Sequence, residues 1–283
     1  MIGLGRMGLP MATRLLDAGF AVRGFDVAAT AGEALTARGG RSSASPGDAV
    51  RDARIVILML PDSDIVDSVT TSPDFESSLA DGGLVVDMGS SNPIRTRALH
   101  ARLQKRGLRL VDAPVSGGVV GAETGKLAIM AGGAESDLAA LDGVLSVLGS
   151  VTHVGPVGSG HALKALNNLL SASTMLATSE AMRVGAAFGL DPETMLEVIN
   201  RSSGRSWSSE FKWPRYVLTD RFDSGFALGL MVKDMRIAVG LGESLDTSTP
   251  FAHQALELWL LAAAELPPTA DHTDIARWVP HIE

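Results

Sequence analysis

The run Gly3-Leu4-Gly5-Arg6-Met7-Gly8, followed by a helical pattern over residues 9–18, decides the fold. It matches G-x-G-x-x-G, in which Gly3 permits a tight turn, Gly5 lets the backbone approach a pyrophosphate, and Gly8 lets the helix pack closely on a strand. The helix N-terminus then offers N–H groups and a partial positive charge to phosphates. The same six residues also suit an ordinary glycine-rich turn, so the residues beyond the helix must decide between the two.

A second strand pattern, over residues 21–25, ends in Asp26. Asp26 stands close to the spacing of about 20 residues at which an acidic side chain accepts hydrogen bonds from ribose hydroxyls. A carboxylate there repels the 2′-phosphate of NADP, and Val27 occupies a position where an arginine would accommodate that phosphate. The glycine run and Asp26 together predict a dinucleotide site, with NAD favoured over NADP.

The first 156 residues alternate between strand patterns and helical patterns. Ile55-Val56-Ile57-Leu58-Met59-Leu60 is a continuous apolar run, which is typical of a strand buried on both faces. Further strand patterns cover residues 84–87 and 108–112, and a helical pattern with Pro93 near its first turn covers residues 92–106. This alternation predicts an α/β domain of the Rossmann type, a doubly wound parallel sheet covered by helices, over residues 1–156.

After Gly160 the pattern becomes helical. Residues 161–188 contain no proline and one glycine, which predicts a helix of roughly 40 Å, and its many apolar residues indicate that it is largely buried. Asp191 and Pro192 supply a cap and a first-turn proline for the next helix. Helical patterns also cover residues 232–241 and 251–265. We therefore predict an all-α second domain over residues 157–283, joined to the first by the long helix.

Composition excludes several classes of function. Lys and Arg total 24 against 32 Asp and Glu, and the net charge of −8 argues against a nucleic-acid surface or an anionic-membrane surface. The sequence has no cysteine, which excludes a thiol nucleophile, disulfides and Cys-ligated metal, and its 6 histidines are scattered. No apolar run is long enough to span a membrane, and residues 1–5 do not resemble a signal peptide, so we expect a cytoplasmic protein.

Two further segments carry side chains suited to catalysis. Ser116-Gly117-Gly118 follows a strand, and such a turn presents a hydroxyl and N–H groups to an anion, although it also suits an ordinary hairpin. Lys164 and Asn168 are one helical turn apart and share a face of the long helix. Burial and an early position in the helix would both lower the pKa of Lys164 toward the range useful for proton transfer, whereas a surface lysine would extend into solvent.

Taken together, these segments resemble the β-hydroxyacid dehydrogenase family, which includes 3-hydroxyisobutyrate dehydrogenase and smaller relatives of 6-phosphogluconate dehydrogenase. The matching segments are residues 3–12, 112–118 and 155–168 and the pair Lys233-Asp234, in order along nearly the whole chain. The resemblance implies an NAD-dependent oxidoreductase that oxidises a small 3-hydroxy acid similar to 3-hydroxyisobutyrate, or reduces the matching semialdehyde, by hydride transfer. It also implies a homodimer or homotetramer and a reaction without a metal.

The resemblance further assigns roles to individual residues. Lys164 is expected to act as general acid/base on the substrate hydroxyl, and Asn168 to orient the substrate. The turn Ser116-Gly117-Gly118 is expected to hold the substrate carboxylate, and Lys233 to reach both substrate and cofactor. The expected cofactor contacts are Gly3, Leu4, Gly5, Arg6, Met7, Gly8, Asp26, Leu60, Pro61, Ser91 and Lys233.

Two other functions are compatible with the same fold. Imine reductases commonly have a different residue at the position of Lys164 and favour NADP, so Lys164 and Asp26 both count against that function. A non-catalytic, dehydrogenase-like oligomerisation module would more plausibly lack Lys164 or carry a basic extension, and neither holds here. Arg205 could contact a second anionic group of the substrate, but an exposed arginine at a helix end is the favoured interpretation.

Overall fold

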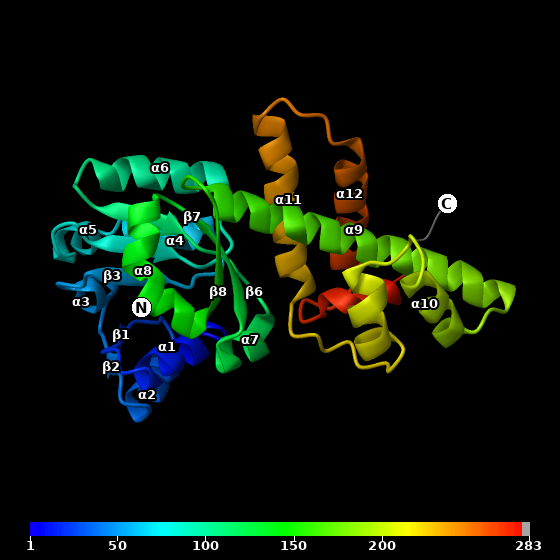
Figure 1. Cartoon of the computed structure of the whole chain (residues 1–283), viewed down its shortest axis with the longest axis horizontal. Helices are drawn as coiled ribbons and strands as arrows, with labels where there is room; N and C mark the ends of the chain where they lie inside the picture. Colours follow the sequence, from blue (N-terminus) through cyan, green and yellow to red (C-terminus); the bar gives the residue numbers. More distant parts are fainter. Residues whose placement is uncertain (279–283) are drawn as a thin grey trace. The chain divides into compact units, whose positions relative to one another are not determined.

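The computed structural model describes residues 1–278. The chain separates into two compact units, Met1–Lys164 and Ala165–Glu283. The first unit contains a sheet with its covering helices, and the second is helical (Figure 1). The predicted fold class, a Rossmann-type domain followed by a helical domain with a long helix, is confirmed. Within residues 1–278, no helix combines the length and the apolar character needed to cross a bilayer.

The main sheet of the first unit has six strands and is mixed. Its strand order is β3 (Ile55–Leu58), β4 (Leu84–Asp87), β5 (Arg109–Asp112), β7 (Leu127–Gly132) and β6 (Val115–Ser116), with β8 (Gly149–Gly155) also paired to β7. The first three strands are parallel. The expectation of a parallel sheet fails beyond them, because β7 runs antiparallel to both β5 and β6.

The N-terminal residues connect this sheet to a small second one. Strands β1 (Arg23–Gly24) and β2 (Arg41–Ser42) form a parallel pair. Ile2 makes parallel bridges to Phe25 on one side and to Leu58 on the other. The first strand is therefore reduced to a single bridging residue, and Gly3 follows immediately at the edge where β1 and β3 end.

The helices of the first unit begin where the sequence supplies caps or prolines. Asn92 Oδ1 accepts hydrogen bonds from the N–H groups of Ile94 and Arg95 and Pro93 occupies the first turn, so the predicted helix over residues 92–106 is observed as α6. The full set is α1 (Gly8–Asp17), α2 (Ala29–Ala37), α3 (Pro46–Val50), α4 (Ser63–Thr70), α5 (Pro73–Ser78), α6 (Pro93–Gln104), α7 (Gly118–Thr124) and α8 (Glu135–Leu148).

The core of the first unit consists of two apolar clusters, one on each face of the sheet. Successive strand residues fall into different clusters: Val56 and Leu58 belong to one, and Ile57 to the other. On the neighbouring strand, Val85 and Val86 divide in the same way. Alternate side chains of a strand point to opposite faces, so the continuous apolar run predicted a sheet that is covered on both sides.

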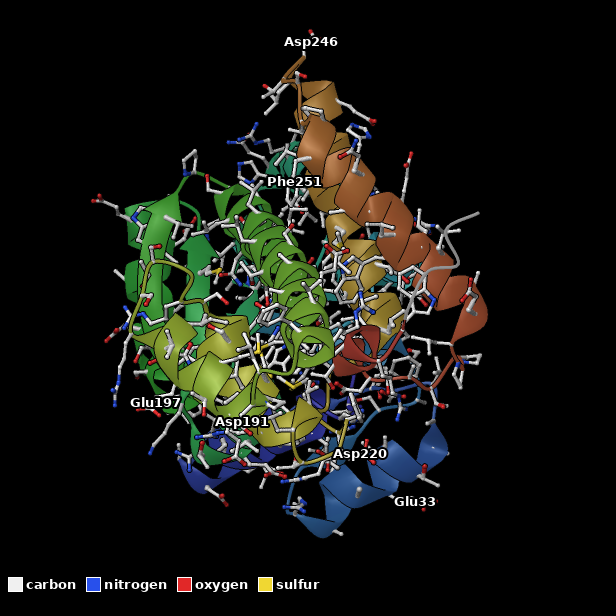
Figure 2. The ribbon with its side chains drawn as sticks, turned by 90° about the vertical axis from the view of Figure 1, so that its right-hand side faces the viewer. Glu33, Asp191, Glu197, Asp220, Asp246 and Phe251 are labelled. Atoms are coloured by element: carbon white, nitrogen blue, oxygen red, sulfur yellow. The ribbon has the colours of Figure 1, made fainter. Side chains whose placement is uncertain are left out.

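The second unit is built from helices around one apolar cluster. Its elements are α10 (Pro192–Asn200), the π-helix η1 (Ser208–Val217), α11 (Leu228–Ser244), α12 (Pro250–Glu265) and the 3-10 helix η2 (His272–Ala276), together with the greater part of α9 (Ser159–Phe188). Trp259 and Met175 are completely buried in the cluster. Asp191, labelled in Figure 2, caps α10 as predicted by accepting from the Thr194 N–H at 2.8 Å.

Helix α9 is buried on one side only, which corrects the expectation that it is largely buried. Lys164, Asn168 and Met175 lie on its buried side. Its other side exposes large apolar side chains to solvent: Leu163, Leu166, Leu170, Val184 and Phe188. Apolar residues all around a helix do not distinguish burial within the chain from burial against another molecule.

Candidate active site

The glycine run forms a tight loop in which two of the three glycines are required by close approach. Gly3 has a φ of +89°, and a Cβ there would lie 2.2 Å from the Met59 carbonyl oxygen. A Cβ on Gly8 would lie 2.0 Å from the Gly3 carbonyl oxygen. Gly5 is exposed and a Cβ on it would meet nothing within 4 Å, so its backbone faces open space. The loop therefore leaves room at the position where a pyrophosphate would approach.

The start of α1 completes this cradle. The helix is capped by Met7, whose side chain makes no capping hydrogen bond, and the first turn contains no acidic residue. The N–H groups of the first turn of a helix lack intrahelical acceptors, and together with the helix dipole they attract anions. The loop and the helix start thus fit the diphosphate of a dinucleotide.

Asp26 is fixed beside the loop by two backbone donors. Its Oδ2 accepts a hydrogen bond of 2.7 Å from the Leu4 N–H, and its Oδ1 accepts one of 2.9 Å from the Ala28 N–H. The next side chain, Val27, is 94% exposed. The structure therefore brings Asp26 to the glycine loop, as its spacing predicted, with no cation at the adjacent position.

A pocket of about 800 Å³ opens next to Asp26. It lies between α2, which contributes Glu33 (labelled in Figure 2), and the segment that follows β2. Its lining residues are Phe25, Asp26, Val27, Ala29, Gly32, Glu33, Thr36, Ser42, Ser43 and Ala44. A pocket that begins at the Asp26 carboxylate has room for the adenosine half of a dinucleotide.

The three other predicted cofactor contacts of this unit follow the ends of β3 and β4. Leu60 is half-buried and Pro61 is exposed, just beyond β3. Ser91, beyond β4, is buried and donates a hydrogen bond of 2.7 Å to Asp87 Oδ2. All three stand at the carboxyl edge of parallel strands, where ligands of open α/β sheets bind.

The start of α9 is held by Asp112, which we did not predict as a site residue. Asp112 Oδ1 accepts from the Gly158 N–H at 2.6 Å, and Oδ2 accepts from the His161 N–H at 2.8 Å. Burial raises the pKa of the Asp112 carboxyl above its ordinary value, although His161 and the two N–H groups act in the opposite direction. The carboxylate thus performs the role of a helix cap from the end of β5.

His161 is a structural residue of the same cluster. Its ring is buried, and Nδ1 lies 2.8 Å from Thr96 Oγ1. Nε2 lies 3.7 Å from Asp87 Oδ2, and Nδ1 lies 3.9 Å from Asp112 Oδ2. Within residues 1–278 no group of three or more His, Asp or Glu side chains has the arrangement of a metal site.

Lys164 and Asn168 follow on the buried side of α9. Lys164 is 9% exposed and Asn168 is 6% exposed. Asn168 Nδ2 donates to Asp234 Oδ2 at 2.5 Å, and Asp234 Oδ1 lies 3.3 Å from Lys233 Nζ. The Asn168 amide oxygen accepts a hydrogen bond of 3.3 Å from Asn167 Nδ2, and the second N–H of the Asn168 amide nitrogen can donate to a substrate oxygen. Asp234 therefore sets the orientation of the Asn168 amide.

The turn Ser116-Gly117-Gly118 adopts a conformation that needs its glycines. Gly117 and Gly118 have φ values of +128° and +61°, respectively. Ser116 is the last residue of β6, and its neighbour in the sheet is Ala128. Both glycines are exposed, while Ser116 is half-buried. The segment is a strand-to-helix turn, since Gly118 begins α7, and it is not the hairpin that the sequence also allowed.

The second unit contains a buried lysine that sequence analysis missed. Lys212 is 7% exposed, and its Nζ donates a hydrogen bond of 2.7 Å to Ser171 Oγ on α9. The only signal in the sequence was the position of Ser171, which continues the stripe of Lys164 and Asn168 along the helix. Arg205, the residue we considered as a second anion contact, is exposed, which agrees with the favoured interpretation.

Comparison with known proteins finds similarity over nearly the whole chain. A family model for the NAD binding domain of 6-phosphogluconate dehydrogenase matches residues 1–155, and a model for NAD-binding of NADP-dependent 3-hydroxyisobutyrate dehydrogenase matches residues 158–279. The NAD-dependent L-serine dehydrogenase of Pseudomonas aeruginosa is 38% identical over 268 residues, which cover 92% of this chain and 90% of that protein.

Two further relatives are similar over comparable lengths. The 2-(hydroxymethyl)glutarate dehydrogenase of Eubacterium barkeri is 37% identical over 91% of this chain and 86% of its own. A solved structure of Mycobacterium tuberculosis 3-hydroxyisobutyrate dehydrogenase with L-serine superposes with a TM-score of 0.92 at 32% identity, covering 98% of this chain and 96% of that one.

Proposed function

The chain belongs to the 3-hydroxyisobutyrate dehydrogenase family of β-hydroxyacid dehydrogenases, and from this premise we propose that it oxidises the hydroxyl of a small 3-hydroxy acid with NAD. It is an NAD(P)-dependent oxidoreductase acting on CH–OH groups. The reverse reaction would reduce the matching semialdehyde. The observation that carries the proposal is the pair Lys164 and Asn168, one turn apart on the buried side of α9.

The first unit binds the cofactor in this proposal. The open backbone at Gly5 and the N–H groups at the start of α1 receive the diphosphate. Asp26 accepts hydrogen bonds from the ribose hydroxyls, and its charge disfavours a 2′-phosphate, which supports NAD over NADP. Leu60, Pro61 and Ser91 line the carboxyl edge of the sheet. When bound, the nicotinamide ring supplies the acceptor or donor of hydride.

Lys164 moves the proton of the substrate hydroxyl. In oxidation the neutral amine accepts this proton while hydride leaves the carbon that bears the hydroxyl. In reduction the ammonium gives the proton back to the oxygen. One N–H of the Asn168 amide donates to Asp234, and the second donates a hydrogen bond to the substrate oxygen and holds it beside Lys164, so that the single hydroxyl proton passes to Lys164. Ser116 and the N–H groups of Gly117 and Gly118 hold the substrate carboxylate, and Lys233 adds a positive charge beside Asp234.

An absorbance assay of nicotinamide reduction against a panel of acids tests the proposal. The panel contains 3-hydroxyisobutyrate, L-serine, 2-(hydroxymethyl)glutarate, 3-hydroxypropionate, glycerate, threonate and 6-phosphogluconate, each with NAD and with NADP. We expect turnover of at least one 3-hydroxy acid, faster with NAD. Silence with every acid, together with reduction of a cyclic imine by NADPH, would instead establish an imine reductase.

The exposed side of α9 supports a further proposal, that the protein is a homodimer or homotetramer. Leu163, Leu166, Leu170, Val184 and Phe188 form an apolar stripe along this side, which we call the outer stripe. Leu163, Leu170 and Val184 are separated by whole heptads, the spacing at which side chains stay on one line of a helix that packs on a partner. A second copy of the chain would cover this surface.

A further inference from the structure

Ser171 continues the line of proposed substrate-binding residues along α9. Lys164, Asn168 and Ser171 are spaced i, i+4 and i+7, so their side chains share one stripe of the helix. A rise of 1.5 Å per residue places Ser171 about 5 Å beyond Asn168 and about 10 Å beyond Lys164 along the axis. We call this set of three residues the polar stripe. A substrate whose hydroxyl lies at Lys164 and Asn168 has the length of the stripe available for the rest of its carbon chain.

Lys212 brings a positive charge to the far end of the polar stripe. Its Nζ donates to Ser171 Oγ at 2.7 Å, which fixes the ammonium one turn beyond Asn168. The charge of Lys212 also acts on His272 within the second unit. Burial lowers the pKa of the His272 imidazole, and the positive charge of Lys212 lowers it further. Lys212 stands in the π-helix η1, a helix type that occurs frequently at functional sites.

The two ends of the stripe differ in charge. At Asn168, the neighbouring carboxylate of Asp234 accepts from the amide and lies 3.3 Å from Lys233 Nζ. At Ser171, the surroundings include the ammonium of Lys212 and hydroxyl groups, with Thr174 Oγ1 and Ser208 Oγ 3.0 Å apart. The far end of the stripe is therefore polar and cationic, which suits an anionic group and disfavours an aliphatic tail.

We infer that Lys212 is a specificity-determining residue that binds a second carboxylate of the substrate. The preferred substrates are then 3-hydroxy acids with two acid groups. The distance of about 5 Å between Asn168 and Ser171 matches a spacer of three or four bonds of about 1.5 Å each. 2-(Hydroxymethyl)glutarate has such a spacer, whereas 3-hydroxyisobutyrate has the same reacting end with a methyl group in place of the acidic arm. The inference rests on the proposed function of Lys164 and Asn168.

The test compares kcat/KM for three acids that share one reacting end: 2-(hydroxymethyl)glutarate, the size-matched monoacid 2-(hydroxymethyl)pentanoate, and 3-hydroxyisobutyrate. The wild-type protein is expected to prefer the diacid over the size-matched monoacid. Lys212→Met, which keeps the length of the side chain and removes its charge, is expected to lower this preference about 10- to 100-fold. Arg205→Met removes an exposed cation from the loop preceding the same π-helix and is expected to leave the preference unchanged.

The inference would be overturned if the wild type and Lys212→Met prefer the diacid over the size-matched monoacid to the same extent. It would also be overturned if Arg205→Met alone loses this preference. Thermal unfolding with each acid, at saturating NAD, distinguishes this failure from that of the proposed function, because a ligand that binds the native state raises the melting temperature. If no acid is turned over, the proposed function fails, and Lys212 is still judged by whether the diacid stabilises the wild type and not the variant. Should Lys212→Met not fold, Lys212→Gln takes its place.

Discussion

The carboxylate of Asp112, at the end of β5, accepts a hydrogen bond of 2.8 Å from the backbone N–H of His161 in the first turn of α9. A strand of the sheet thereby fixes the start of the helix that carries Lys164. The same carboxylate accepts from Gly158 N–H, so it takes up two of the N–H groups that a helix start leaves without acceptors. The position of the proposed acid/base thus depends on a residue that has no chemical role of its own.

Replacing Asp112 is expected to weaken both the fold and catalysis. Asp112→Ala leaves two buried N–H groups without acceptors, and after relief of the buried charge is counted we expect a loss of about 2 kcal/mol in the free energy of unfolding. The kcat should fall while NAD affinity is retained, since the glycine loop is untouched. Urea denaturation and steady-state kinetics measure these effects, with the exposed Asp142→Ala on α8 as control. Unchanged stability would show that the helix start is held by other contacts.

Lys164→Ala is expected to abolish turnover. General acid–base catalysis typically contributes about 10²- to 10⁴-fold to a rate. The kcat should therefore fall by at least about 10²-fold. NAD binding, measured by calorimetry, should remain almost intact. The exposed Lys126→Ala serves as a control for the loss of one positive charge from the same unit. Retained activity would remove Lys164 from its proposed role.

Asp26→Ala is expected to weaken NAD binding more than NADP binding. The variant loses the charged acceptor of the ribose hydroxyls, whose hydrogen bonds contribute about 1.5 to 3 kcal/mol, and it also loses the repulsion of the 2′-phosphate. The ratio of the two dissociation constants should therefore shift toward NADP by roughly tenfold or more. Asp17→Ala, at the exposed end of α1, should not alter the ratio. An unchanged ratio in Asp26→Ala would contradict the assignment of cofactor preference to this residue.

Asp271 is expected to make stability dependent on pH in the acid range. Burial alone would raise the pKa of this carboxyl, but hydrogen bonds from His272, Thr273 and Ser224 outweigh it and hold the pKa well below its ordinary value. A lowered pKa means that the stabilisation is present above about pH 4 and is lost as the pH falls further.

Asp271→Asn should therefore be less stable than the wild type by about 2 kcal/mol at neutral pH. The difference should narrow as the pH is lowered below about 4, because the carboxyl of the unfolded wild type then takes up a proton while that of the folded protein, with its lowered pKa, still resists protonation. Denaturant titrations across this range measure it. A difference that stays constant with pH would show that the hydrogen-bond geometry, and not the charge, is responsible.

Leu170→Glu is expected to shift the protein toward monomers. Leu170 lies in the middle of the outer stripe, where a buried carboxylate at an interface would be strongly unfavourable. Size-exclusion chromatography with light scattering measures the mass. Leu245→Glu, at an exposed apolar residue beyond α11, provides the matched control. A monomeric wild type, or an oligomer that Leu170→Glu leaves intact, would contradict the role of the outer stripe.

The parts of the fold that were predictable from the sequence are those with local patterns. Residues 84–87 coincide with β4, α10 begins at its predicted proline-containing start, and α12 begins one residue before the predicted pattern, because apolar runs, caps and prolines act on their immediate neighbours. Strands β6, β7 and β8 were missed. They lie at the mixed edge of the sheet, where short strands and glycines leave little periodic pattern.

The contacts that complete the candidate site were not predictable for a related reason. Thr96 and His161 are separated by 65 residues in the sequence, and Ser171 and Lys212 by 41. Nothing in the local composition indicates which serine a distant lysine will meet. The glycine run was found because the spacing of its glycines is the one that a diphosphate-binding turn requires. Lys164 and Asn168 were found because they stand four positions apart, which places both on one face of a helix.

The crowding at Gly3 and Gly8 contrasts with the open surroundings of Val27, and this contrast determines where the protein can change. A side chain at either glycine would collide with backbone oxygens, whereas Val27 is 94% exposed and touches little that would have to move. A lineage that exchanges one nicotinamide cofactor for the other is therefore free to change residue 27 without first acquiring compensating stability elsewhere, whereas a change at Asp26 would also remove the acceptor of the Leu4 N–H. For an engineer, residue 27 is where a library should begin.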